Sequence, residues 1–239
     1  MTLILVPYRD RAMHLQIFIR DLSPIFKLHI PNVKIVIIEQ TQDNKLFNRG
    51  KLLNVGFLEY YKEFDYVFTH DVDRLPYENT VINNYNNKDF DIKRFNGGNS
   101  NSLGGICKFK SQIFKDINGF PNDIWGWGLE DEALYTRAIL KNCKISNLPD
   151  GGSNQPKSYF YLPHKSSNGN KNLTNDLYNK RDKMGSGCIW RCGVDLKPEK
   201  LNNQQKNRYL VTNGLDDINY KVINKEIINN YIEKITVEI

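Results

Sequence analysis

The sequence predicts an α/β fold in which a largely parallel sheet is flanked by helices. Three short strand-like runs at residues 3–6, 33–38 and 65–70 alternate with stretches at 12–26 and 45–64, where apolar residues recur at helical spacing. Runs that are mostly apolar are typical of strands covered on both faces. Strands and helices in alternation, with short connections, favour parallel strands with helices packed against the sheet.

Each element of the first half has its own local signal. The helix at 12–26 has apolar residues on one side and polar residues between them, and the run at 33–38 is β-branched, as buried strands often are. The stretch at 45–64 has one apolar helical face, but Gly50 and Gly56 lower its helix propensity. We therefore expect the order strand, helix, strand, helix, strand.

The second half is less regular. The polar, Asn-rich stretch 83–101 predicts a loop or edge structure, and the segment 163–205 predicts a long connection of the kind that is usually functional or disordered. The remaining expected elements are helices at 108–117 and 129–141 and strands at 143–148, 158–162, 218–223 and 231–239.

Composition excludes several classes of protein. The 239 residues carry 33 Lys and Arg against 27 Asp and Glu, a formal net charge of +6, and the positive residues are scattered among acids. A nucleic-acid-binding protein usually gathers them in a stripe, so we expect no nucleic-acid partner and favour a smaller anion such as a nucleotide diphosphate. The longest apolar runs have four residues, far below the ~20 of a bilayer-spanning helix, so no membrane span is expected.

The four cysteines do not predict a metal centre. Cys188 and Cys192 are spaced C-x-x-x-C, but no second pair and no histidine at zinc-finger spacing accompany them. Four cysteines in a chain of this length also do not make a disulfide scaffold, although a bridge between these two remains open.

Two aspartates directly after the third strand are a candidate metal and substrate site. Asp71 and Asp73 follow the run at 65–70, and ligands of open α/β sheets bind outside the carboxyl ends of the strands. Carboxylates suit a hard divalent cation that bridges to substrate phosphates. A solvated turn is the alternative explanation of this pair.

A second candidate site is the block Trp-Gly-Trp-Gly-Leu-Glu-Asp-Glu at 125–132. Its three acids begin a predicted helix, where they also complement the helix dipole. Two tryptophans beside two glycines indicate flat surfaces for stacking on a sugar or nucleotide, on a loop able to move. A carboxylate beside such a surface could accept a proton from a substrate hydroxyl.

Other residues near predicted strand ends have weaker signals. His164 follows a strand and could join Asp73 on a metal, although a lone histidine is more often a surface residue. Arg9, Arg11 and Arg49 could bind phosphate. The pair Gly104-Gly105 permits close approach of the backbone to a ligand.

In their order along the chain these segments resemble the catalytic domain of the β-1,4-galactosyltransferase family, glycosyltransferase family 7. The resemblance covers nearly the whole chain, and the ordered set is much more specific than any one motif. The segments that carry it are Val6–Arg11, Phe47–Phe57, Asp71–Pro76, Gly104–Gly105, Asn118–Asn122 and Trp125–Asp131.

The resemblance implies a GT-A glycosyltransferase fold, with a Rossmann-like mixed sheet flanked by helices and an irregular acceptor-binding half. We expect one catalytic domain over 1–239, in which 1–76 forms the nucleotide-sugar half and 77–239 the acceptor half, with a long loop near 163–205. The donor-binding residues it implies are Pro7, Arg9, Arg11, Phe47, Arg49, Asp71, Ser102 and Gly105. The acceptor-binding residues it implies are Trp125, Leu129, Glu130 and Asp131.

It also implies a reaction. Asp73 and His164 would bind Mn²⁺ or another divalent cation, which neutralises charge on the leaving UDP. Asp131 would act as general base on an acceptor hydroxyl, Glu130 would face the sugars, and Trp127 would close over the donor. The expected partners are UDP-galactose or UDP-N-acetylgalactosamine and a sugar or glycan acceptor, and the expected product is an inverted, β-1,4-type glycoside.

The sequence departs from the family pattern at four positions. Tyr161 and Ser166 stand where the family places a further metal ligand, Ser102 replaces a common tyrosine beside the donor sugar, and Leu129 replaces a glycine before Glu130. Ser102 would leave room for an N-acetyl group, which is why both donors stay open.

The family's membrane anchor and stem have no counterpart in this sequence. We expect a free-standing viral or microbial enzyme of the cytoplasm, or a Golgi-lumen enzyme if the sequence is a piece of an anchored protein. The alternatives are a catalytically silent glycan-binding relative with the same fold and, more remotely, a basic nucleic-acid-binding module.

Overall fold

A mixed sheet of eight strands crosses the molecule. The structure is a computed structural model that describes residues 1–95, 101–126, 128, 130–148, 159–163 and 202–239, and the following order refers to these. In sheet order the strands are β7 (Ile145–Asn147), β5 (Ile92–Arg94), β6 (Ile106–Lys110), β3 (Tyr66–His70), β1 (Thr2–Tyr8), β2 (Val33–Gln40), β10 (Ile232–Glu238) and β9 (Lys221–Asn229). The four strands β3, β1, β2 and β10 run parallel, which confirms the expected α/β class.

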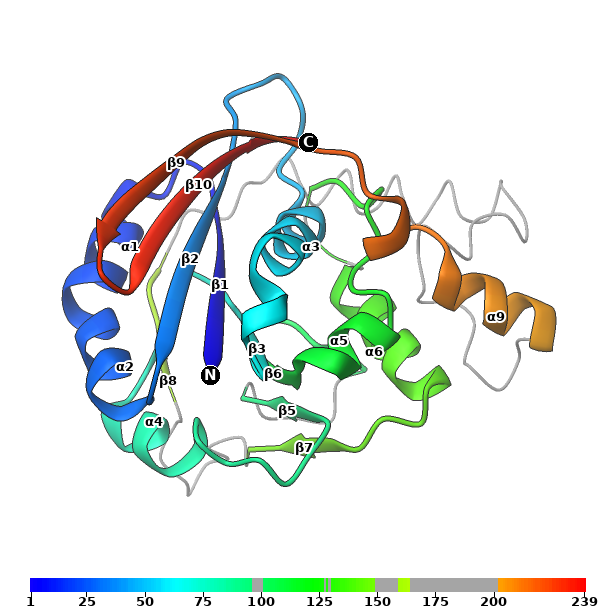
Figure 1. Ribbon diagram of the computed structural model, residues 1–239, viewed down its shortest axis with the longest axis horizontal. Coiled ribbons are helices and arrows are strands. Elements are labelled where there is room, and N and C mark those ends of the chain that lie inside the picture. The colour runs from blue at the N-terminus through cyan, green and yellow to red at the C-terminus, as the bar shows by residue number, and fades with distance from the viewer. Residues whose placement is uncertain (96–100, 127, 129, 149–158, 164–201) are drawn as a thin grey trace.

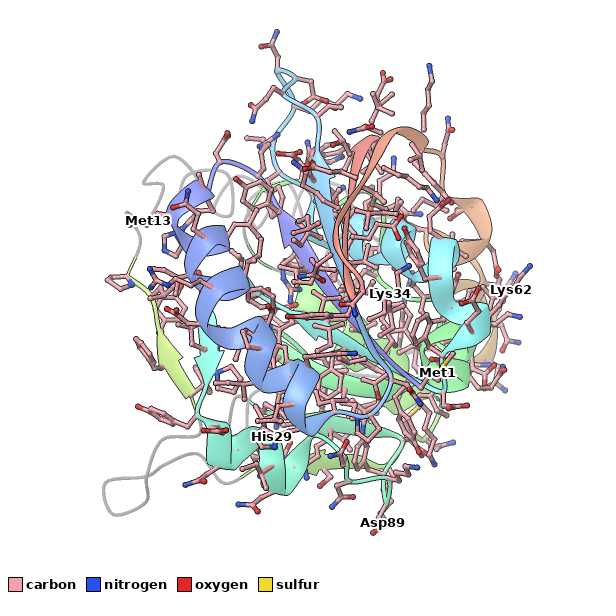
Figure 2. All side chains as sticks on the ribbon, turned by 60° about the vertical axis from the view of Figure 1, so that its left-hand side comes forward. Met1, Met13, His29, Lys34, Lys62 and Asp89 are labelled. Atoms are coloured by element: carbon pink, nitrogen blue, oxygen red, sulfur yellow. The ribbon has the colours of Figure 1, made fainter. Side chains whose placement is uncertain are left out.

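Helices cover both faces of this sheet (Figure 1). On one side lie α1 (Ala12–Ile17), α2 (Ser23–His29) and α4 (Glu78–Asn84), and on the other α3 (Arg49–Tyr60), α5 (Ser111–Asp116) and α6 (Glu130–Leu140). In Figure 2, Met13 on α1 and Lys62 just after α3 lie on opposite sides of the molecule. A further helix, α9 (Asn203–Val211), packs against α6.

The core is divided in two by the sheet. Successive side chains of β1 point to opposite faces, so Leu3 and Leu5 join the cluster under α3 while Ile4 and Val6 join the cluster under α1 and α2. All four side chains are fully buried. Burial on both faces explains why the sequence of this strand is apolar throughout rather than alternating.

The first predicted helix is helical over its whole length but contains a π turn. Residues Phe18–Leu22 form this turn between α1 and α2. Pro24 lies in the first turn of α2 and cannot donate a backbone hydrogen bond, so the α-helical ladder is interrupted before it. The Ser23 hydroxyl donates to the carbonyl of Ile19 at 2.6 Å, so this carbonyl has a side-chain donor in place of a backbone one.

Helix α3 is shorter than predicted and begins at an N-cap. The Asn48 side chain accepts a hydrogen bond from Lys51 N at 2.9 Å, which fixes the start of the helix. Gly56, which lowers helix propensity, has a packing reason: a Cβ there would lie 2.8 Å from Ile38 of β2. The glycine lets the helix approach the sheet closely.

Several expectations for the second half are wrong. The helix predicted at 108–117 begins only at Ser111, because β6 occupies 106–110. The stretch 83–101, predicted as loop or edge, contains strand β5, which lies inside the sheet between β7 and β6. The strand predicted at 218–223 lies instead at 221–229 as β9, and α9 was not predicted.

Other predicted strands are confirmed. They are β7, β10 and β8 (Tyr159–Tyr161), which pairs with β4 (Arg74–Pro76) in a separate two-stranded sheet. Among the described residues, no helix combines the length and apolar character needed to cross a membrane. Residues 164–201, most of the predicted long connection, lie outside the described residues, as do Cys188 and Cys192.

Candidate active site

The candidate site lies where β3 ends, beside the first turns of α3 and α6. Asp71 is the first residue after β3, and its backbone N donates to Gly105 O at 3.1 Å. The carboxyl ends of parallel strands form this edge of the sheet, as the sequence predicts. Parts of the chain that are far apart in sequence therefore meet at one place.

Arg49 joins the two predicted acidic sites. Its Nε donates to Asp71 Oδ1 at 2.6 Å, and its Nη1 donates to Asp131 Oδ1 at 2.7 Å. Nη1 also lies 3.9 Å from Glu130 Oε1, and the guanidinium carbon lies 5.6 Å from the centre of the Phe120 ring. The side chain of Arg49 is 11% exposed, so these are largely desolvated ion pairs.

Glu130 and Asp131 occupy the first turn of α6 and are held in an environment that disfavours their charges. Burial raises the pKa of Asp131, although Arg49 acts in the opposite direction. Burial, and next the charge of Asp131, raises the pKa of Glu130. Two adjacent carboxyl groups with raised pKa values and one shared cation are an arrangement suited to accepting a proton.

The glycine pair lies directly against the carboxylate of Asp131. A Cβ at Gly104 would lie 2.0 Å from Asp131 Oδ2, so no residue with a side chain fits there in this arrangement. The backbone N of Leu103 donates to Asp131 O at 3.0 Å. Gly105 has φ +71°, a conformation that favours glycine, and its carbonyl accepts from Asp71 N.

Asp73 contacts the chain at β8, in the separate two-stranded sheet. Leu162 N donates to Asp73 O at 2.8 Å, and the Tyr161 hydroxyl hydrogen-bonds to the Asp73 side chain. Burial, followed by the charge of Asp73, raises the pKa of Tyr161 to about 12. Tyr161, at the position where the sequence analysis expects a further metal ligand, therefore contacts Asp73, the predicted metal ligand.

The described residues offer oxygen donors for a divalent cation but not a complete site. Among them no group of three or more His, Cys, Asp and Glu side chains is arranged so that it could hold a metal ion. The predicted second ligand, His164, lies outside the described residues. The carboxylate of Asp73 fits a hard cation that keeps water and phosphate ligands, and the protonated Tyr161 hydroxyl donates to that carboxylate.

The predicted donor residues at the end of β1 are close to one another. Arg9 donates from Nη1 to Lys45 O at 3.0 Å, and its guanidinium lies 5.6 Å from the centre of the Phe47 ring. Pro7 is buried in β1, and Arg11 lies just before α1. The structure thus brings Arg9 and Phe47 together and places Arg11 outside the ion pairs of Arg49.

The predicted acceptor residues are only partly described. Trp125 is half-buried against the core under α3, with Lys45 Nζ 5.9 Å from its ring. Trp127 and Leu129 lie outside the described residues. Ser102 is half-buried, and its carbonyl accepts a hydrogen bond from Arg94 Nη1 at 2.9 Å.

His70 is a buried group behind the site. Its ring meets Phe18 and Phe26 edge-on, at centroid distances of 5.4 and 5.6 Å, and Nδ1 lies 3.0 Å from Asp71 O. Burial lowers the pKa of His70 to about 4, so the ring is neutral at pH 7 and Nδ1–H can donate to that carbonyl. This bond fixes the backbone that leads into Asp71.

The sequence analysis missed one charged residue of the site, Arg74. Its Nε lies 3.6 Å from Asp71 Oδ2, and its guanidinium lies between the rings of Tyr159 and Tyr161. A cation directly after two acids, in Asp-x-Asp-Arg, was the signal that could have identified it.

Comparisons with known proteins give matches over most of the chain. Residues 1–88 match the family model described as the N-terminal region of glycosyl transferase group 7, and residues 85–165 match the one described as the N-terminal domain of galactosyltransferase. The chain is 33% identical over 234 residues to human beta-1,4-galactosyltransferase 4. That alignment covers 93% of this chain and 59% of the relative, so the chain spans about three fifths of the relative's length.

The fold is also that of a solved structure. The catalytic domain of Drosophila beta1,4galactosyltransferase 7, in complex with xylobiose, superposes with a TM-score of 0.71 at 23% identity, covering 99% of this chain and 93% of that one. A mutant of that protein in complex with manganese, UDP-Gal and xylobiose gives the same TM-score at 24% identity and the same coverage. This likeness confirms the expected GT-A fold.

Proposed function

The chain belongs to glycosyltransferase group 7, and from that membership we propose that it transfers galactose or N-acetylgalactosamine from a UDP-sugar to a hydroxyl group of a sugar acceptor. The relatives named beta-1,4-galactosyltransferase support galactosyl transfer. The neighbouring structure in complex with UDP-Gal and xylobiose supports a UDP-sugar donor and a sugar acceptor. We propose a β-1,4-type bond on the same grounds.

One observation carries this proposal: Arg49 holds Asp71 and Asp131 at the same point. The two carboxylates come from the end of β3 and the start of α6, and Arg49 contacts both within 2.7 Å. A donor sugar bound near Asp71 and an acceptor hydroxyl near Asp131 would then be neighbours. Placing two reactants side by side is a large part of catalysis in a two-substrate transfer.

Asp131 acts as the general base. Its carboxylate takes the proton from the acceptor hydroxyl as the hydroxyl oxygen attacks the anomeric carbon and the bond to the diphosphate breaks. Attack from the face opposite the leaving group inverts the configuration. The raised pKa of Asp131 makes it a stronger base than an ordinary aspartate, and Arg49 keeps its carboxylate oriented.

Asp73 and the predicted ligand His164 would hold the divalent cation. When bound, Mn²⁺ or a similar ion supplies positive charge to the leaving diphosphate. Tyr161 orients the carboxylate of Asp73 through their hydrogen bond. Trp127 is proposed to cover the donor, which would exclude water from the reaction.

The donor sugar is the finer part of the proposal. Ser102 is half-buried and lies two residues before the glycine pair that contacts Asp71 and Asp131. Its small side chain would leave room for an N-acetyl group on the donor sugar. Turnover measured with UDP-galactose and UDP-N-acetylgalactosamine, each with a panel of sugar acceptors and with and without Mn²⁺, decides between the two donors.

We predict that Asp131→Asn lowers turnover by about 10²–10⁴-fold, the usual contribution of a general base, because an amide cannot accept the proton. UDP release gives the rate, and calorimetry with UDP gives donor binding, which should remain close to that of the unsubstituted protein. Asp21→Asn is the matched control, since the exposed Asp21 side chain pairs with its neighbour Arg20 on the π turn.

Turnover in the Asp131→Asn variant equal to that of Asp21→Asn would remove Asp131 from the base role. Glycan binding with no turnover for any donor and acceptor pair would instead favour a catalytically silent relative over an enzyme.

A further inference from the structure

Arg74 lies on the same side of the small sheet as the proposed metal ligand. It begins β4 directly after Asp73 and pairs in register with Tyr161 of β8. Side chains that face each other across an antiparallel pair point to the same face. Since Tyr161 hydrogen-bonds to Asp73, the side chains of Arg74, Tyr161 and Asp73 converge on one place.

The guanidinium group of Arg74 is held in position by aromatic rings. Its central carbon lies 5.2 Å from the ring centre of Tyr159 and 5.6 Å from that of Tyr161. Nη1 donates to the Tyr159 hydroxyl at 2.8 Å. Cation–π contacts and a hydrogen bond restrict a side chain that otherwise has many rotamers, so the charge is oriented before a ligand arrives.

The charge of Arg74 acts inside the site, not on a remote surface. Nε lies 3.6 Å from Asp71 Oδ2, and the positive charge of Arg74 opposes the rise of the Asp131 pKa. The side chain is 22% exposed, which leaves it partly accessible from solvent. A bound anion would therefore meet a partly desolvated, fixed cation.

We propose that Arg74 is a further donor-binding residue that contacts the diphosphate of the nucleotide sugar beside the divalent cation. This inference rests on the proposed function, because it takes the UDP-sugar and the cation at Asp73 as given. A cation at Asp73 places phosphate oxygens next to the neighbouring side chain, and arginine has the planar geometry that suits phosphate. Arg74 then offers permanent positive charge to the leaving group as the sugar–phosphate bond breaks.

The test compares UDP with uridine. Arg74→Met should weaken UDP binding in the presence of Mn²⁺ about tenfold, the size of one lost charge-assisted contact, and leave uridine binding unchanged. Calorimetry measures UDP, ligand-observed NMR measures uridine, and EPR of free Mn²⁺ measures the metal. The UDP affinity of Arg74→Lys should lie between those of Arg74→Met and the unsubstituted protein, since lysine keeps the charge and loses the planar group.

Arg20→Met is the matched control, because Arg20 is an exposed arginine on the π turn. Equal losses of UDP and uridine affinity would mean that Arg74 only maintains the local structure, and this would overturn the inference. Unchanged UDP affinity, or a loss explained by weaker Mn²⁺ binding, would also overturn it. If the unsubstituted protein binds no UDP with Mn²⁺, the proposed function itself fails.

Discussion

At the scale of single residues, Arg49 determines how the site is charged. Burial by itself would lower the pKa of Arg49, but Asp131, Asp71 and Glu130 together raise it, so the group stays cationic. The carboxylates in turn depend on Arg49, because a buried acid without a partner tends to take up a proton. The ion pairs are therefore a unit, and removing one member changes the charge state of the others.

A substitution at Gly104 would show how closely the position of the Asp131 carboxylate is fixed. We predict that Gly104→Ala lowers turnover by about 10²-fold, because its Cβ would lie 2.0 Å from Asp131 Oδ2 and displace the carboxylate from its position. Steady-state kinetics of UDP release measure the effect, and the change should appear in kcat more than in the KM of the donor.

The double variant of Gly104→Ala with Asp131→Asn is the control. If alanine acts by displacing the base, adding it to Asp131→Asn should cost little more, since the base is already absent. Independent, additive losses would show that Gly104 acts through something other than Asp131.

The residues of the site were predictable to different degrees. Asp71 and Asp131 could be predicted because each follows or begins a recognisable element, and the structure places both at Arg49. The contact of Arg74 with Tyr159 could not, since it joins residues 85 positions apart and depends on the register of two three-residue strands. Short strands have no sequence period from which that register could be read.

At the scale of elements, helix α6 connects the site to the rest of the chain. Its first turn carries Glu130 and Asp131, and two turns later Arg137 is almost fully buried. Arg137 donates four hydrogen bonds, at 2.8–3.0 Å, to the backbone carbonyls of Asn118, Gly119, Thr212 and Asn213. One side chain thus joins α6 to two loops that are distant in sequence.

We predict that Arg137→Met lowers the free energy of unfolding by about 2–4 kcal/mol, because four buried or partly buried carbonyls lose a charged donor. Denaturant unfolding followed by circular dichroism measures this. Arg137→Lys should recover part of the loss. The exposed control Arg20→Met should stay within about 0.5 kcal/mol of the unsubstituted protein, and an Arg137→Met variant as stable as this control would contradict the prediction.

Strand β6 is one of the elements that sequence reasoning assigned wrongly. Its centre is Lys108, which is almost fully buried although its charge suggests an exposed helix position. Lys108 Nζ donates to Tyr85 O and to Asn87 O, at 2.5 and 3.0 Å, and lies 4.2 Å from the centre of the Tyr66 ring. These partners come from other elements, so the local sequence could not indicate that a lysine would be buried in a strand.

At the scale of the whole molecule, Lys108 makes stability depend on pH. Burial lowers its pKa from the ordinary 10.5 to about 7, so between these values the unfolded chain binds a proton that the folded chain does not. Stability should therefore rise with pH through this window. We predict that Lys108→Met has a flatter dependence than the unsubstituted protein when the free energy of unfolding is measured between pH 7 and pH 10.

Lys62→Met is the control for this comparison, because Lys62 is exposed on the turn after α3. The free energy of unfolding of Lys62→Met should rise with pH as steeply as that of the unsubstituted protein. A Lys108→Met variant with that same slope would mean that the buried amine stays charged, held so by its two carbonyls and the aromatic ring.

The overall architecture was more predictable than its second half. The order β1, α1, β2, α3, β3 could be predicted because these strands are covered on both faces and are therefore apolar throughout. Strand β5 and the full extent of β9 could not, since β5 contains Lys93 and Arg94 although it lies inside the sheet, and most of β9 is exposed. The spacing of apolar residues in a sequence indicates which residues are buried. It therefore does not predict a strand whose buried side chains are charged, or a strand that is largely exposed.

The position of β10 has a consequence for how the chain is made. β10 completes the parallel sheet beside β2, yet the contact between Thr236 and Glu39 spans 197 positions. On a ribosome, β2 would leave the exit tunnel long before β10 and keep an unpaired apolar edge until β10 had been synthesised. Pairing over such a separation is slow, and open edges attract other chains. Yield from a cell should therefore depend on translation speed and on chaperones that cover this edge.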